Sequence, residues 1–230
     1  MEDVTPLRAL SGGDGACGQT GWSRADLMSA PLATVGSVLP ALTVLPRSVT
    51  EPVTDRLVLS RPKTEDVDAI LRIHADPETN RHNPAVPMST RAEAVERLAW
   101  FTAHWDEYGF GYWSVRLRDD QRPSNDGPGE PVGFAGLRWS RWVGRDVLNL
   151  YYRFTPAVWG CGLATEAARA GVALWRGHLD GYPLVARTTS DNVASQRTAL
   201  AAGFDRRPDL DRATDLGLDI VLALGWGAAS

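Results

Sequence analysis

Residues 159–166 of the chain read Trp159-Gly160-Cys161-Gly162-Leu163-Ala164-Thr165-Glu166. They follow a strand-like run, 147–154, and they begin a helix-like run that lasts to about His178. Two glycines and an alanine at such a turn leave main-chain N–H groups uncovered, and the first turn of a helix has no internal acceptors for its own N–H groups. Because the helix dipole adds partial positive charge there, the segment predicts an anion-binding turn.

Two familiar nucleotide motifs do not fit this turn. The dinucleotide fingerprint G-x-G-x-x-G needs a glycine where Thr165 stands, and it usually follows the first strand of a chain. A P-loop ends in Gly-Lys-Ser/Thr, which this turn does not contain. Cys161 is a candidate nucleophile, but no histidine stands in an obvious partner position, and a thiol that fills a variable loop position is the commoner case.

The regions around the turn alternate between strand-like and helix-like patterns. Strands are expected at 56–61, 112–117, 132–139, 146–154, 184–189 and 216–224, and helices at 64–75, 90–107, 163–178 and 192–203. The order is β-α-α-β-β-β-α-β-α-β, with a long Pro/Gly/Asp connection between the second and third strands. This order predicts an α/β (α+β) fold around a mixed sheet.

Residues 1–50 differ from the rest of the chain. They carry few charges and show no clear period, and the uncharged stretch 28–46 is interrupted by Pro31 and Pro40. A membrane-spanning helix is therefore not expected, and the stretch begins too late for an ordinary secretory signal. We expect a flexible or atypically packed arm over 1–50, followed by one domain over 51–230.

The charge and the cysteine and histidine content of the chain limit the ligands, metals and location that are expected. The formal net charge is −4, which argues against nucleic acid and suits a cationic amine substrate. The two cysteines form no disulfide framework, so a cytoplasmic location is expected. The four histidines have no metal-binding spacing, so no metal is expected.

Three motifs in the right order resemble a known family. They are Thr54-Asp55-Arg56-Leu57-Val58-Leu59, then YRFTPAVWGCGLATEA at 152–167, then Asn192-x-x-Ser195 followed by Leu200 and Gly203-Phe204. Together, over about 54–226, they resemble the GNAT acetyltransferase superfamily and, within it, the ribosomal-protein alanine N-acetyltransferases of the RimJ/RimL type. The resemblance implies a mixed, mostly antiparallel sheet of about six to seven strands, with a splayed central pair and about four flanking helices.

The resemblance also implies an activity and a site. The activity is transfer of acetyl from acetyl-CoA, or of another acyl group from its CoA thioester, to a primary amine by direct attack in a ternary complex. The implied cofactor-binding residues are Phe154, Thr155, Trp159, Gly160, Cys161, Gly162, Leu163, Ala164, Thr165 and Asn192. Trp159 departs from the general pattern, which carries Gln or Arg in that stretch. No tyrosine follows in the last helix, where many relatives place their general acid, so the resemblance assigns the role to Ser195.

Several alternatives stay open at this stage. Asn192 either anchors the pantetheine or positions a water, or it is only a helix cap. A carboxylate from the first two helices, acting through water, is the candidate base. The acceptor is a protein N-terminus or a small-molecule amine, and the chain is a monomer or a homodimer. A CoA-binding module without catalysis and an α/β domain for another nucleotide are the rival functions.

Overall fold

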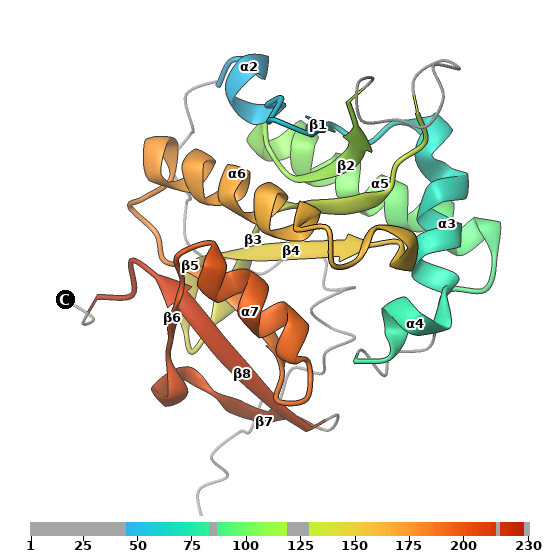
Figure 1. Ribbon diagram of the computed structural model, residues 1–230. Helices are drawn as coiled ribbons and strands as arrows, with labels where there is room; N and C mark the ends of the chain where they lie inside the picture. The colour runs from blue at the N-terminus through green and yellow to red at the C-terminus, as the bar shows by residue number, and fades with distance from the viewer. Residues whose placement is uncertain (1–44, 83–86, 119–128, 215–216, 228–230) are drawn as a thin grey trace, which may run out of the picture.

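The computed structural model describes residues 45–82, 87–118, 129–214 and 217–227, and these residues build one sheet with helices on both faces (Figure 1). The strands are β1 (Leu57–Ser60), β2 (Tyr112–Leu117), β3 (Gly133–Trp142), β4 (Arg145–Phe154), β5 (Leu184–Thr189), β6 (Asp205–Arg206), β7 (Arg212–Thr214) and β8 (Gly217–Leu224). The helices are α2 (Arg47–Thr50), α3 (Val67–Ala75), α4 (Pro77–Asn80), α5 (Arg91–Tyr108), α6 (Leu163–His178) and α7 (Val193–Ala201). Short 3₁₀ turns lie at η1 (Thr64–Asp66), η3 (Pro156–Val158) and η4 (Pro208–Leu210).

The sheet runs β1-β2-β3-β4-β5-β8-β6, and β7 also pairs with β8. Every pair is antiparallel except β4 and β5. Those two parallel strands are in register only at Leu148 with Leu184 and at Asn149 with Val185. Because β4 continues to Phe154 without a partner on that side, the sheet is split between β4 and β5 from Leu150 onward.

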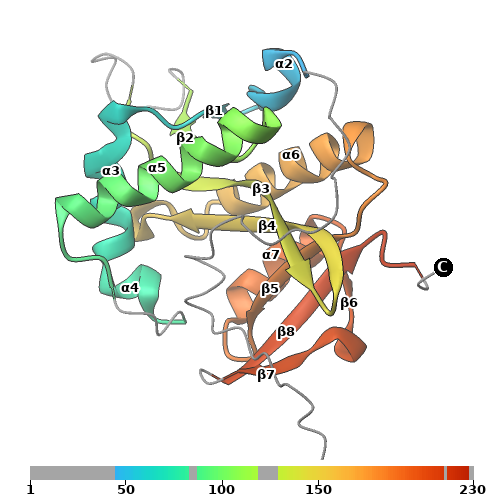
Figure 2. The same cartoon turned by 180° about the vertical axis from the view of Figure 1, so that it is seen from behind.

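The helices form one layer on each face of the sheet. Figure 1 shows α6 and α7 in front of the strands, and the opposite view in Figure 2 shows α3 and α5 in front of the other face. The helix ends follow ordinary capping chemistry. Thr90 caps α5, its side chain accepting from the Glu93 N–H while the Glu93 carboxylate accepts from the Thr90 N–H.

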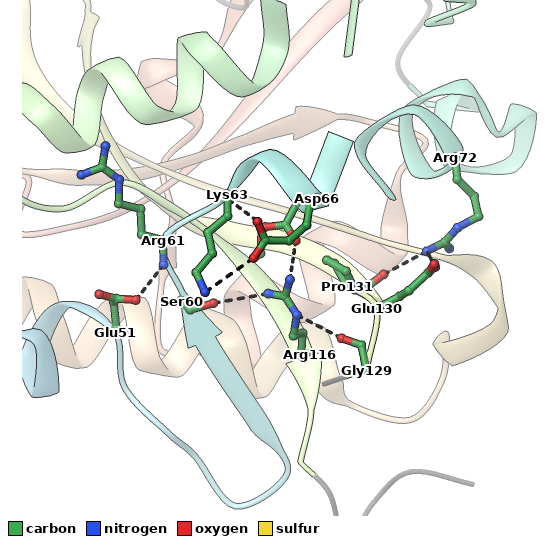
Figure 3. Close-up of polar contacts among 12 residues, drawn as sticks. Glu51, Ser60, Arg61, Lys63, Asp66, Arg72, Arg116, Gly129, Glu130 and Pro131 are labelled. Carbon is green, nitrogen blue, oxygen red and sulfur yellow. Dashed lines mark hydrogen bonds and ion pairs between the residues drawn. The ribbon is translucent and has the colours of Figure 1, made fainter. Parts of the chain in front are cut away.

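A buried carboxylate ties the start of α3 to β2 (Figure 3). Asp66 has no exposed surface, and it accepts hydrogen bonds from the Ser114 hydroxyl at 2.6 Å, from the Lys63 N–H at 2.9 Å and from Arg116. Arg116 also donates to the Gly129 carbonyl at 3.0 Å. Since an unpaired buried charge is costly, this network fixes η1 against the strand beneath it.

The predicted fold class is confirmed, and all six predicted strands and four predicted helices are present. The described residues hold eight strands, because the short β6 and β7 add to the edge at β8, and two further single-turn helices, α2 and α4. The first long helix was predicted from residue 64, but residues 64–66 form η1 and α3 begins at Val67. Within the predicted arm, residues 45–50 include α2, whose Thr50 carbonyl accepts from the indole of the buried Trp113 at 2.5 Å; residues 1–44 lie outside the described part.

Candidate active site

A cavity of about 830 Å³ opens where β4 and β5 separate. Its walls come from the second half of β4, from β5, from the turn before α6 and from the first turns of α7, with α4 and Trp100 of α5 closing the other side. The predicted acyl-CoA motif and the predicted Asn-x-x-Ser motif therefore meet at one cavity, although a whole helix and a strand separate them in sequence.

The split leaves part of the β4 main chain facing the cavity. The Leu148 N–H donates to the Pro183 carbonyl at 2.8 Å, on the β5 side. Because N–H groups alternate sides along a strand, those of Leu150, Tyr152 and Phe154 point the same way, into the slot. The Thr155 N–H points to the opposite side, where it donates to the Val132 carbonyl at 2.9 Å.

The glycine turn lies at the mouth of this slot. Gly160 and Gly162 both have φ of +77°, a left-handed conformation that favours glycine. The first helical hydrogen bond runs from the Glu166 N–H to the Gly162 carbonyl, so the N–H groups of residues 163–165 precede any intrahelical bond. The Trp159 indole donates to the Phe154 carbonyl at 2.8 Å and so fastens the turn to the end of β4.

A hydrogen-bonded group of Thr54, Arg56 and Glu166, here called the brace, holds the glycine turn in place. The Glu166 carboxylate accepts from the Thr54 hydroxyl at 2.6 Å, from the Arg56 N–H at 2.8 Å and from the Arg56 Nε at 2.7 Å. Arg56 Nη1 donates to the Cys161 carbonyl at 2.8 Å. Partial burial alone would raise the pKa of Glu166, but the hydrogen bonds from Thr54 and Arg56 hold it below its usual value. The brace thus orients the turn through an ionised carboxylate.

A tyrosine on β4 reaches the start of α7. The Tyr152 hydroxyl lies 2.8 Å from the main-chain oxygen of Ser195 and 2.9 Å from its Oγ. Burial raises the pKa of Tyr152 to about 12, partly offset by its hydrogen bond to Ser195. Asn192 caps α7, and its Oδ1 accepts from the Ser195 N–H at 3.1 Å. Asn192 therefore caps α7, as one of its two predicted roles requires, and it also lines the cavity.

Two groups that line the cavity have ordinary acid–base chemistry, His82 and Glu78. His82 Nδ1 lies 2.9 Å from Asp191 Oδ2, a contact that joins the end of α4 to the loop before α7. The neighbouring Thr189 hydroxyl and the His82 ring lower the pKa of Asp191 to about 2, so Asp191 accepts and Nδ1 carries the proton. Glu78 is paired with Arg81 at 2.8 Å.

Most of the predicted site residues line this cavity. They are Phe154, Trp159, Gly160, Gly162, Leu163, Ala164, Thr165, Asn192 and Ser195. Thr155 and Cys161 do not line it, and the exposed Cys161 thiol points its Sγ to the Trp159 carbonyl at 3.7 Å. Sequence reasoning missed the pairing of Tyr152 with Ser195 and the position of His82, and no carboxylate of α3 or α5 lines the cavity.

Over the described ranges, no group of three His, Cys, Asp or Glu side chains is placed to hold a metal ion. The helices in that part of the chain are also too short or too polar to cross a membrane. His74 and His104 are buried in the core, and both nitrogens of each ring have a hydrogen-bond contact.

Comparison with known proteins gives consistent matches. A family model described as an acetyltransferase (GNAT) domain matches residues 56–205. An uncharacterized N-acetyltransferase of Bacillus subtilis, YoaA, is 26% identical over 153 residues, which cover 66% of this chain and 81% of that protein. Two solved structures share the fold. An acetyltransferase from Agrobacterium tumefaciens has a TM-score of 0.60 at 21% identity, covering 79% of this chain and 95% of that one. RimL, a ribosomal alpha-N-protein acetyltransferase in complex with coenzyme A, has a TM-score of 0.59 at 15% identity, covering 75% and 96%.

The matched segment begins at Arg56, in the brace beneath the glycine turn, and it ends beyond α7. It therefore contains the split strands, the turn and the Tyr152–Ser195 pair that form the cavity. The chain belongs to the GNAT family of acetyltransferases.

Proposed function

We propose that the protein transfers an acyl group, acetyl in the simplest case, from its CoA thioester to a primary amine within a ternary complex. The observation that carries this proposal is the split between β4 and β5, with the glycine turn at its mouth and the Tyr152–Ser195 pair in its wall. The RimJ/RimL-type motifs and the RimL structure among the matches favour a protein N-terminus as acceptor. The absence of a disulfide framework in the sequence favours a cytoplasmic reaction.

In this proposal the main chain holds most of the CoA. The N–H groups of residues 160–165 bind the pyrophosphate, aided by the dipole of α6. A Cβ added at Gly160 would meet no protein atom within 4 Å, so a ligand can approach that main chain closely. The slot-facing N–H groups of Tyr152 and Phe154 pair with the pantetheine arm. Thr155 and Cys161 contribute less than the resemblance implies, because neither lines the cavity.

The chemistry follows from the groups around the slot. The amine attacks the thioester carbonyl, a C–N bond forms, and a slot-facing N–H of β4 stabilises the oxyanion. The C–S bond then breaks, and Ser195 Oγ–H protonates the departing thiolate. Tyr152 lies within hydrogen-bond distance of Ser195 Oγ, passes its proton to the serine oxygen, and is reprotonated in turn by water. Because the pKa of Tyr152 is about 12, its hydroxyl is protonated at neutral pH at the start of each turnover.

His82 is assigned as the base that takes the proton from the amine. Its Nδ1–H donates to Asp191, which places the lone pair of the neutral ring on Nε2. An α-amine, with a reference pKa of about 8, is easier to deprotonate than a lysine side chain at about 10.4, which also favours an N-terminal acceptor. Asn192 orients Ser195 through the α7 cap rather than through the substrate.

The proposal is tested by thermal shift and by thiol release. Acetyl-CoA is expected to raise the melting temperature more than NAD or ATP does, and thiol release is expected to require an added amine or peptide. His82→Gln is expected to lower kcat by about 100-fold. The matched control His178→Gln changes an exposed side chain at the end of α6, outside the cavity, and is expected to have no effect.

Each other outcome has a defined meaning. Stabilisation by CoA without thiol release from any acceptor would identify a CoA-binding module without catalysis. A larger shift with NAD or ATP would identify a different nucleotide site. Equal kcat values for wild type and His82→Gln would remove His82 from the mechanism while leaving the transfer reaction in place.

A further inference from the structure

The lining of the cavity is rich in positive charge. Five arginines line the cavity, and Glu78 is the one carboxylate among its lining residues in the described part of the chain. The arginines are Arg81, Arg138, Arg153, Arg187 and Arg197. Glu78 is already paired with Arg81, so among the described lining residues no second carboxylate offsets the charge of Arg138 or Arg153. This local charge is opposite in sign to the net charge of −4.

Strand register brings three of these arginines to one face. Arg138 of β3 lies opposite Asn149 of β4, and Asn149 lies opposite Val185 of β5. Arg153 is four residues after Asn149, and Arg187 is two residues after Val185, so all three side chains share the face that α5 covers. Arg138 and Arg187 therefore lie beside the closed end of the slot, where β4 and β5 begin to separate, and Arg153 lies further along β4, toward the glycine turn.

Arg138 is the most constrained of the three. It is only 7% exposed, and its Cζ lies 3.4 Å from the centroid of the Trp100 ring. Its Nε is buried without a hydrogen-bond partner among the described residues, and so is the Trp100 Nε1. Burial lowers the pKa of Arg138 to about 10. Two buried donors beside a cavity require an acceptor, and an anionic one suits the guanidinium best.

Resting on the transfer reaction proposed above, we propose that Arg138 and Trp100 form a carboxylate-binding subsite at the closed end of the slot, with Arg187 beside it and Arg153 further along β4 toward the mouth. One of the two reactants therefore carries a carboxylate besides its reacting group. This carboxylate belongs either to the amine acceptor, such as an acidic peptide or an amino acid, or to the acyl group of a dicarboxylic acyl-CoA. Both present the same chemistry to the same donors.

The neighbours of Arg138 fit this role. Trp100 supports the flat face of the guanidinium, which leaves its edge for in-plane hydrogen bonds. Arg153 is held by a neutral group, the Asn80 side-chain oxygen at 2.9 Å, so its charge is not neutralised by that contact. Arg187 lies over the Trp142 ring, with its Cζ 4.4 Å from the centroid. Stacking on aromatic rings holds both Arg138 and Arg187 in place for a planar carboxylate.

The test uses reactant pairs that differ only in the carboxylate. For the acceptor, β-alanine is compared with β-alaninamide, and a peptide that begins with aspartate is compared with its asparagine counterpart, each with acetyl-CoA. For the donor, succinyl-CoA is compared with acetyl-CoA on a neutral amine. The wild type is expected to prefer the anionic member of one set by at least about tenfold in kcat/KM. The set that shows the preference identifies the source.

Variants at Arg138 locate the preference. Arg138→Met keeps an unbranched stem against Trp100 and is expected to remove the preference, because it lowers kcat/KM for the anionic partner by at least about tenfold more than for the neutral partner, while the Kd of CoA stays within about twofold. Arg138→Lys keeps the charge but not the planar fork, and is expected to retain part of the preference. Arg141→Met is the control, because Arg141 is on the same strand but is exposed and does not line the cavity.

Three results would each overturn the subsite. They are an equal loss of kcat/KM for charged and neutral partners in Arg138→Met, a wild type that prefers the anionic member in neither set, and a weaker Kd for CoA in Arg138→Met. If the wild type releases thiol with none of these reactant pairs, the proposed transfer reaction is contradicted, but the subsite is not. The subsite is then measured by thermal shift in the presence of CoA, with succinate against succinamide. Succinate is expected to stabilise the wild type and Arg141→Met but not Arg138→Met, and equal shifts in all three would sink the idea.

Discussion

The Tyr152 hydroxyl lies 2.9 Å from Ser195 Oγ and 2.8 Å from the Ser195 carbonyl oxygen. A carbonyl only accepts, so Tyr152 donates to it, and Ser195 Oγ–H is then the donor toward the Tyr152 oxygen. The pair joins β4 to α7 across the slot, beside the edge of the sheet where the thioester is proposed to lie. It therefore both positions Ser195 and keeps a second proton within reach.

Ser195→Ala is expected to lower kcat by about 100-fold, and Tyr152→Phe by about tenfold, because the first removes the proton donor and the second removes its support. Since the pKa of Tyr152 is raised to about 12, the hydroxyl stays protonated below pH 10, and the Tyr152→Phe loss is expected to be the same at every pH from 6 to 9. Steady-state rates over that range provide the measurement. Tyr182→Phe, outside the cavity, is the control, and a loss that varies with pH would rule out this role.

Gly160→Ala is expected to weaken CoA binding by about tenfold, because a Cβ there strains the left-handed turn and meets the ligand. Gly144 is a matched control, since its φ of +75° is close to the +77° of Gly160 and a Cβ at either position meets no protein atom within 4 Å. Both variants are expected to lose about 1 kcal/mol of stability. Calorimetric Kd values for CoA are expected to separate them, and equal Kd values would show that the turn does not contact the ligand.

Local patterns predict most of this fold. The strands 112–117 and 184–189 and the helix 163–178 have the predicted bounds, because their apolar periodicity and their flanking glycines and prolines are local signals. The turn between β3 and β4 was predicted at 140–145, but β3 continues to Trp142 and only Val143 and Gly144 turn. Val143 has φ of +48°, a conformation that a β-branched residue rarely adopts, so its sequence gave no turn signal.

The site was predictable only where it is local. The glycine turn and Ser195 belong to short motifs, whereas His82 and Asp191 are 109 residues apart and meet through the tertiary structure. The arginines of the carboxylate subsite come from three different strands and form no motif. Net charge suggested a cationic substrate, yet the cavity lining is cationic, because net charge averages over surfaces that the ligand never contacts.

Acid is expected to destabilise the protein through two buried histidines. His74 and His104 each donate from Nδ1 to a carbonyl and accept at Nε2, from the Tyr151 hydroxyl and the Trp139 N–H respectively. Burial lowers the pKa of both to about 3, from a reference value of 6.5. The unfolded chain therefore binds more protons below pH 6.5, so stability falls as pH drops from 6.5 toward 3.

At pH 5 the expected loss is about 2 kcal/mol for each histidine relative to pH 7. Urea unfolding at the two pH values measures it. Replacing either histidine by glutamine, which keeps a donor and an acceptor, is expected to reduce the pH-dependent loss by about 2 kcal/mol, whatever the variant does to stability at pH 7. An unchanged pH dependence in both variants would contradict this account.

Asp66→Ala is expected to lower the free energy of unfolding by about 3–5 kcal/mol, because it leaves Arg116 and the Ser114 hydroxyl without their acceptor. Asp68 is a matched control two residues later, with a side chain that is 78% exposed and paired with Arg91 at 3.1 Å. Asp68→Ala is expected to cost less than about 1 kcal/mol. Urea unfolding at pH 7 distinguishes them, and equal costs would mean that the buried network does not fix η1 against β2. Since neither residue lines the cavity, the Kd of CoA for folded protein is expected to stay the same in both variants.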